Sequence, residues 1–152
     1  MKKLAVISLI LAMCLPAYAN TSDLDGLFEA YAAVPGYKTV ILGPKILQTM
    51  AKNGSEESDI IKNIEQIRVL STLEPDDNLF LKAQSIAESE YEQVSINMEG
   101  DDYTGFYIKD SYDKKMSFLM IARREEQVII MEISGYFSIK DISKLSNIGS
   151  YK

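Results

Sequence analysis

The stretch "VSINMEGDDYTGFYIK", residues 94–109, alternates apolar and polar side chains on both sides of one polar turn. Val94, Ile96 and Met98 occupy every second position, "EGDD" supplies the turn, and the alternation resumes from Tyr103 to Lys109. A period of two residues is typical of strands, because successive side chains point to opposite faces of a sheet. The stretch therefore predicts two antiparallel strands joined by a short turn.

Two further segments continue this pattern toward the C-terminus. Residues 116–123 and 127–136 are rich in aliphatic side chains, and the polar sequences "DSYDKK" and "REE" precede them. Short polar turns between such segments favour consecutive antiparallel neighbours. The second half of the chain is thus expected to form a four-strand antiparallel meander, followed by a final helix that Ser138 caps.

The first half has a different, mostly helical character. An apolar stripe that starts at Leu24 recurs at helical spacing until Pro35-Gly36 ends it. Residues 37–42 are β-branched and predict a strand, Pro44 opens a short helix, and residues 55–63 predict another helix. Helices and strands therefore share this half of the chain.

Residues 64–71 carry two competing patterns. Ile60, Ile64 and Ile67 lie at helical spacing, while Ile67 and Val69 alternate as in a strand. We expect a strand here, with a helix as the alternative, because the segment is short and β-branched.

A further helix is expected from residues 75–77 onward, which completes the pattern of a helix-rich first half and a strand-rich second half. The sequence therefore predicts an α+β fold: a mostly antiparallel sheet of about five to six strands, including the C-terminal four-strand meander, with helices packed on one face.

The N-terminus has the features of a secretory signal peptide. Two lysines precede an apolar stretch from Leu4 to Pro16 that is too short to span a bilayer. Ala17-Tyr18-Ala19 then matches the small-x-small pattern that signal peptidase recognises. We expect cleavage between Ala19 and Asn20, which leaves a single domain over residues 20–152 after the signal peptide of residues 1–19 is removed.

Cys14 offers an alternative, a lipid anchor on the first residue of the mature chain. A lipidation signal favours a small residue directly before its cysteine, and this chain has Met13 there. We therefore expect Cys14 to be lost and the protein to be periplasmic, with no membrane span after cleavage.

Composition excludes several classes of function. The expected mature chain has neither His nor Cys, so it has no Ser-His-Asp triad, no Cys-His pair and no usual zinc ligand set. Removing the two leader lysines changes the formal charge from −6 to −8, and a chain this acidic is not expected to bind nucleic acid. No nucleotide-binding motif or calcium loop occurs, so we expect no cofactor, no metal and no catalytic residue.

Carboxylates are the remaining candidates for chemistry. They occur as the pairs Glu56-Glu57, Asp76-Asp77, Asp101-Asp102 and Glu125-Glu126. Each pair lies at a predicted turn or helix start, where acids cap amides and oppose the helix dipole. A glycosidase would instead need two acids that face each other across a cleft. A carboxylate-dependent hydrolase of envelope glycans is therefore an alternative function.

Aromatic placement suggests a contact surface on the meander. Tyr103, Tyr107 and Lys109 share one face of their strand, and Phe106 and Ile108 share the other. We expect Phe106 and Ile108 to serve the helix-covered core, which leaves the tyrosines on the open face. Tyrosine there either covers a solvated sheet or forms a recognition surface, since it offers a large area with a polar tip. The sequence thus places a candidate partner surface at Tyr103, Tyr107 and Lys109.

Four segments of the chain follow one another in a familiar order: "LFEAYAAVPGYKTVILG", "IIKNIEQIRVLSTLE", "YEQVSINMEGD" and "VIIMEISGYFSIKDISKL". In this order they resemble a known family of small exported bacterial proteins, domain of unknown function 4252. Their most specific features are Gly36 before the first strand, the "IRVLS" strand and the closing strand–Gly135–helix unit. The resemblance implies this fold and an exported location, and it carries over no catalytic residue. Some members look like lipoproteins, a feature from which this chain departs at Met13.

Taken together, these features predict an exported, non-catalytic binding or assembly module of the cell envelope. Its partner is expected to be another protein or a second copy of the chain. The alternatives are the glycan hydrolase and a sensory component of the envelope stress response.

Overall fold

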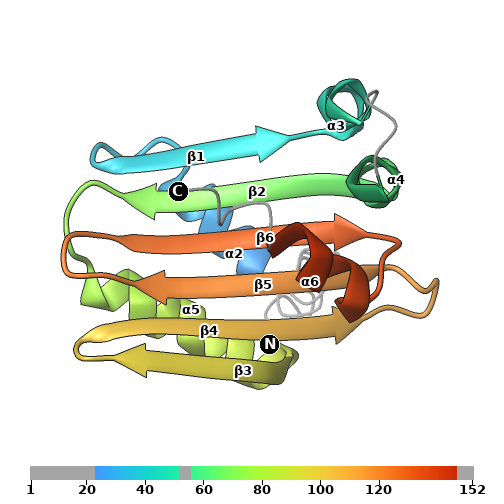
Figure 1. Ribbon diagram of the computed structural model, residues 1–152. Coiled ribbons are helices and arrows are strands. Elements are labelled where there is room, and N and C mark those ends of the chain that lie inside the picture. Colours follow the sequence, from blue (N-terminus) through green and yellow to red (C-terminus); the bar gives the residue numbers. More distant parts are fainter. Residues whose placement is uncertain (1–22, 52–55, 147–152) are drawn as a thin grey trace, which may run out of the picture.

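The computed structural model describes residues 23–51 and 56–146, which form one six-strand antiparallel sheet with helices on both sides (Figure 1). The strand order is β1-β2-β6-β5-β4-β3. Strands β3 to β6 are consecutive neighbours, so the predicted C-terminal meander and the α+β fold class are confirmed.

The strands and helices have the following bounds. The strands are β1 (Tyr37–Leu42), β2 (Ile64–Thr72), β3 (Glu92–Glu99), β4 (Asp102–Asp110), β5 (Met116–Arg123) and β6 (Val128–Gly135). The helices are α2 (Asp23–Tyr31), α3 (Pro44–Met50), α4 (Glu56–Lys62), α5 (Asp77–Glu90) and α6 (Ile139–Ser146).

The ambiguous segment over residues 64–71 is a strand. As β2 it pairs with β1 on one side and with β6 on the other, so both rows of its backbone groups bond to neighbouring strands. A β-branched segment fits this interior strand, because its side chains pack on both faces of the sheet while its backbone pairs on both edges. Tertiary pairing thus decides between the two sequence patterns.

Helices α2 and α5 pack on one face of the sheet, called here the covered face (Figure 1). Leu24, Leu27 and Phe28 of α2 join Leu79 and Ala83 of α5 in the larger hydrophobic core. The sheet contributes to this core the buried side chains of Leu70, Tyr103, Tyr107, Leu119, Ile121, Val128 and Ile130. This is the predicted layer of helices on one face.

Helix α6 lies on the opposite face, over one end of strands β5 and β6 (Figure 1). Its Ile142 and the preceding Phe137 pack with Phe118 and Ile133 in a second, smaller core. Ser138 and Asp141 form a reciprocal cap, in which the Ser138 amide donates to the Asp141 carboxylate at 2.9 Å. The structure therefore adds to the prediction a helix on the second face, which it covers only at one end.

Gly135 makes the turn into α6 possible. A Cβ atom at this position would lie 2.3 Å from the carbonyl oxygen of Asn63 and 2.8 Å from Cα of Ile64. Backbone at that distance leaves no room for a side chain. The end of β6 can therefore close against the start of β2 only with glycine at position 135.

Within the described residues, none of the helices is both long and apolar enough to cross a bilayer. The signal sequence, Cys14 and the cleavage site between Ala19 and Asn20 lie outside the described residues.

Candidate functional site

Tyr103 and Tyr107 lie on the covered face, so their assignment to the open face is wrong. Their side chains are 3% and 1% exposed beneath α5. Their two hydroxyl oxygens are 2.7 Å apart, so one hydroxyl donates a hydrogen bond to the other inside the core. Burial, followed by the hydrogen bond to Tyr103, raises the pKa of Tyr107. These tyrosines are core residues and offer no surface to a partner.

The residue between the tyrosines explains how two such rings fit under one helix. A Cβ atom on Gly105 would lie 2.8 Å from the Tyr103 hydroxyl and 2.8 Å from Cε2 of Tyr107. Without that atom the two rings fold together above the strand, and Phe80 of α5 meets Tyr103 edge to face at 5.1 Å. The Tyr-x-Gly-x-Tyr spacing could have predicted this packing. The polar hydroxyls of the tyrosines instead suggested that the rings face solvent.

Lys109 shares the covered face with the tyrosines but lies at its margin. Its ammonium is 3.6 Å from the Glu90 carboxylate and 5.6 Å from the centre of the Tyr91 ring. Both partners lie at the end of α5. Lys109 therefore helps to hold that end of the helix against β4.

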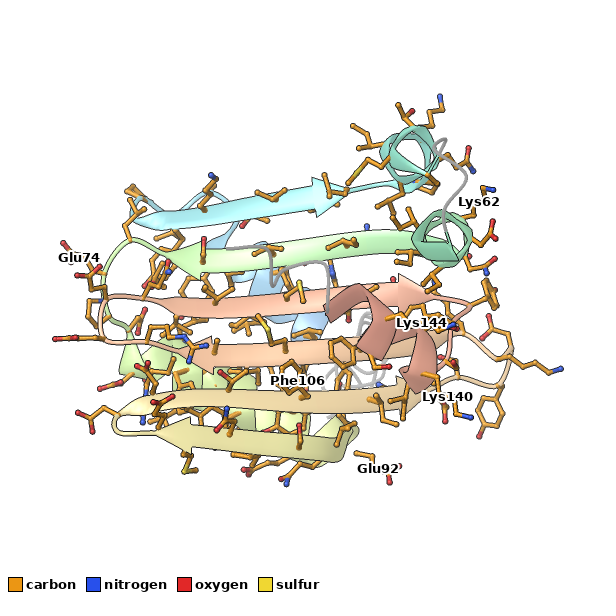
Figure 2. The ribbon with its side chains drawn as sticks, in the orientation of Figure 1. Lys62, Glu74, Glu92, Phe106, Lys140 and Lys144 are labelled. Atoms are coloured by element: carbon orange, nitrogen blue, oxygen red, sulfur yellow. The ribbon has the colours of Figure 1, made fainter. Side chains whose placement is uncertain are left out.

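The opposite face carries a row of apolar side chains that crosses five strands. Cross-strand pairing runs from Val40 to Val69, Met131, Met120 and Phe106. We call these five residues the open row. Val40 is 37% exposed and the other four are partly exposed, although all four of their strands lie in the interior of the sheet. Figure 2 shows Phe106 on this face, beside α6.

Helix α6 and exposed lysines border the open row. Lys140 and Lys144 project from α6 (Figure 2), and Lys38 lies on the same face of β1, opposite Ser71. Lys38 and Lys140 are exposed. The open row is therefore an apolar strip bordered by positive charge on a protein whose net charge is negative.

The open row contains two methionines, and Met116 packs nearby on the same face. Methionine has a flexible, polarisable side chain, and it is common on surfaces that adapt to a partner. No catalytic group is needed for such a surface. The chemistry that the open row supports is apolar contact.

A buried ionic cluster occupies the covered face. Arg68 donates to one Glu132 oxygen at 2.7 Å and lies 2.6 Å from the Asp25 carboxylate of α2. The other Glu132 oxygen accepts hydrogen bonds from Tyr91 at 3.2 Å and Ser117 at 3.1 Å. Burial opposes the charge on Arg68, yet the two carboxylates together raise its pKa. This arrangement, which sequence reasoning missed, leaves Glu132 with partners at both oxygens and ties α2 to the sheet.

The structure brings several of the predicted acidic pairs together. Asp76, Asp77, Asp101 and Glu125 line a surface hollow of about 380 Å³, with Arg123 and Arg124 between them. Asp76 is already engaged, because it accepts a hydrogen bond from the Leu79 amide at 3.0 Å, as an N-cap should, and a short one from the Tyr37 hydroxyl. The hydrogen bond from Tyr37, followed by that from the Leu79 amide, lowers the pKa of Asp76.

The described residues contain no cluster of three or more His, Cys, Asp or Glu side chains that could hold a metal ion. The side chains of Glu56 and Glu57 lie outside the described part of the chain.

Comparison with known proteins places the chain in one family. The model of the family "Domain of unknown function (DUF4252)" matches residues 31–145. This range contains all six strands and α3 to α5, so it covers the open row and the Arg68–Glu132 pair of the ionic cluster, while Asp25 lies before it. No curated protein and no solved structure matches the chain. Since the family model spans most of its length, the chain belongs to the family of domain of unknown function DUF4252.

Proposed function

We propose that this protein is an exported, non-catalytic binding module of the cell envelope. In this proposal the leader is cleaved between Ala19 and Asn20, and the mature domain is periplasmic. The signal-like N-terminus supports the location. The open row supports the binding activity.

The observation that best supports this proposal is the difference in burial between adjacent residues of the same strand. Val69, Met120 and Met131 are partly exposed, while their neighbours Leu70 and Ile130 are fully buried. A contiguous apolar patch on the surface of a soluble protein commonly marks an interaction site, because burying it removes apolar area from water.

The proposed occupant is another protein with an apolar patch bordered by carboxylates. Lys38 and Lys140 flank the open row and would pair with such carboxylates at the rim. These flanking lysines are the reason for proposing a partner with carboxylates at its rim, and the crosslinking experiment below distinguishes it from a second copy of the chain.

Site-specific photocrosslinking in the native envelope tests this proposal. A photoreactive amino acid at Met131 should yield a discrete crosslinked species, while the same amino acid at the exposed Leu81 of α5 should not. Substituting Met120→Ser should reduce the yield at Met131 while the melting temperature changes little. Equal yields from both positions, or none from Met131, would contradict the proposal. A product with twice the mass of the chain would replace the partner with a second copy.

The proposed export has its own measurement. Intact mass spectrometry of the protein recovered from the envelope should give a chain that begins at Asn20 and has no acyl chain. A lipidated chain that begins at Cys14 would instead make the protein membrane-anchored.

The hydrolase alternative would place its acids in the hollow near Asp76. A general acid needs a raised pKa, so that it holds a proton at neutral pH. The pKa of Asp76 is lowered and its oxygens cap α5, which suits a structural role. The open row remains the better-supported site.

A further inference from the structure

Strand β3 is the last strand of the sheet, and its free edge has no strand of the described chain beside it (Figure 1). All eight of its residues are exposed. An edge strand presents unpaired N–H and C=O groups, which can accept another extended segment. The edge of β3 is therefore a second candidate interaction surface, separate from the open row.

Proteins usually protect such edges, and β3 has little protection. The opposite edge strand, β1, is shorter and carries the exposed Lys38. In β3 the register shifts once, between Gln93 and Ser95, and the four residues from Ser95 to Met98 contain no charge. The uncharged segment from Ser95 to Met98 favours pairing with another strand.

The two sides of β3 differ in chemistry. Ile96 and Met98 pair with Gly105 and Tyr103, so they lie on the covered side, where they are 38% and 68% exposed. Glu92 pairs with Ile108 and thus lies on the open side, at the free edge in Figure 2.

Glu99 completes this arrangement at the far end of the strand. It pairs with Asp102, which places it on the same side as Glu92. In the described part of the chain, neither Glu92 nor Glu99 forms an ion pair. The edge therefore presents apolar side chains on one side and a carboxylate near each end of the other.

We propose that the edge of β3 accepts an extended segment of a partner protein as a seventh strand. Such a segment would alternate, with apolar side chains toward Ile96 and Met98 and basic side chains toward Glu92 and Glu99. A second copy of β3 is disfavoured as occupant, because two edges that each carry these carboxylates repel one another.

The length of the occupant follows from strand geometry. Glu92 and Glu99 are about 20 Å apart along an extended chain that has one bulge, which matches two basic residues separated by six positions. The acetylated and amidated peptide Lys-Val-Ser-Val-Ser-Val-Lys has this pattern. Its sequence reads the same in both directions, so it fits a parallel or an antiparallel addition.

Fluorescence anisotropy with a labelled form of this peptide tests the proposal. We expect saturable binding at low salt, and at least a tenfold weaker affinity when the double variant Glu92→Lys/Glu99→Lys is used. The matched control, Glu125→Lys/Glu126→Lys in the turn before β6, makes the same change in net charge and should alter the affinity less than twofold. A peptide with Glu in place of both Lys should not bind.

Hydrogen exchange distinguishes strand addition from simple charge attraction. Peptide binding should slow amide exchange in β3, and a peptide N-methylated at alternate amides should fail to bind, because it lacks the donors for pairing. The proposal is overturned if the peptide does not bind, if the two double variants bind equally well, or if protection appears outside β3. It is also overturned if gel filtration shows that the protein alone dimerises and Glu92→Lys/Glu99→Lys abolishes the dimer.

Discussion

The two faces of the sheet differ most at neighbouring positions of the same strands. One cross-strand row lies on the covered face and consists of Leu70, Ile130 and Ile121, each 0% exposed. The row one residue away is the open row, whose members are partly exposed. Both rows are apolar, and they consist of adjacent residues of the same strands, whose side chains point to opposite faces. Composition therefore does not tell the faces apart, and the placement of α2 and α5 decides which row becomes the core.

Polar groups with side-chain partners are also concentrated on the covered face. The ionic cluster of Arg68, Glu132 and Asp25 lies on the covered face, as does the hydroxyl pair of Tyr103 and Tyr107. Groups of this kind depend on exact partners, and so they make the covered face sensitive to substitution. The open row makes only apolar contacts that tolerate change. Stability should therefore depend mainly on the covered face and on the smaller core beside α6, and binding on the open row.

The largest effect is expected from Arg68→Met. This change leaves the buried Glu132 carboxylate without its cation, and breaking a buried pair typically costs about 3–5 kcal/mol. Urea unfolding followed by circular dichroism would measure the loss. The double variant Arg68→Met/Glu132→Leu should recover much of it, because no buried charge then lacks a partner. A single variant as stable as the wild type would show that the cluster contributes little.

Adjacent residues of β5 give the most direct test of the two faces. Leu119→Ala removes a fully buried side chain from the covered face and should lower the free energy of unfolding by about 2–5 kcal/mol. Met120→Ala acts on the open row and should cost less than about 1 kcal/mol. The same unfolding assay checks both variants. Equal losses would mean that the open row is as much a core as the covered face.

A smaller loss is expected from Gly105→Ala, about 1–3 kcal/mol, because the added methyl group must displace the packed rings of Tyr103 and Tyr107. Ser95→Ala on β3 is a suitable control, since that residue is exposed on the open side. Thermal unfolding should rank the two variants in this order. A neutral Gly105→Ala variant would mean that the rings move aside without cost.

The smallest effect concerns pH and the hydrogen bond between Tyr37 and Asp76. This bond lowers the pKa of Asp76 below its usual 3.8, so its contribution is present above that pH and is lost as the pH falls through the folded-state value. The same bond raises the pKa of Tyr37 from 10.0 to about 12, so its contribution is complete below pH 10 and is lost as the pH rises toward 12.

Tyr37→Phe should remove the dependence at high pH and reduce the one at low pH, where the Leu79 amide still lowers the pKa of Asp76. Melting temperatures of the wild type and the variant should differ at pH 7 and converge at both extremes. A difference that stays constant with pH would contradict the assignment of this hydrogen bond.

The strands of the C-terminal meander could be predicted from the sequence. Which face of the sheet the helices cover could not. Alternation and turn residues located β3 to β6 within one or two residues, because a strand's own pattern and its turns are local features. The assignment of faces failed at β4, where Tyr107 and Phe106 are both aromatic and either could serve a core. The tyrosine hydroxyls suggested a solvent-exposed position, yet they form a hydrogen bond with one another in the core.

The candidate site was predictable only in part. The segments "MSFLMIA" and "VIIMEI" are apolar on both faces, which indicated an uncovered apolar surface somewhere on β5 and β6. Which face stays uncovered depends on how far α6 extends over the sheet. Ile142 of α6 and Ile133 of β6 belong to the same hydrophobic cluster, which forms across a turn that requires Gly135. No local sequence pattern predicts this packing.

The strand order has a consequence for how the chain acquires its structure. Strand β6 comes last in the sequence among the strands, yet it lies between β2 and β5. Until residues 128–135 are available, the hairpin of β1 and β2 and the ribbon of β3, β4 and β5 have no shared edge, and each alone is too small to bury a core. We expect a nascent chain to remain unfolded until its last strand is released. In the export that we propose, this late closure would keep the chain unfolded until its last strand has been made.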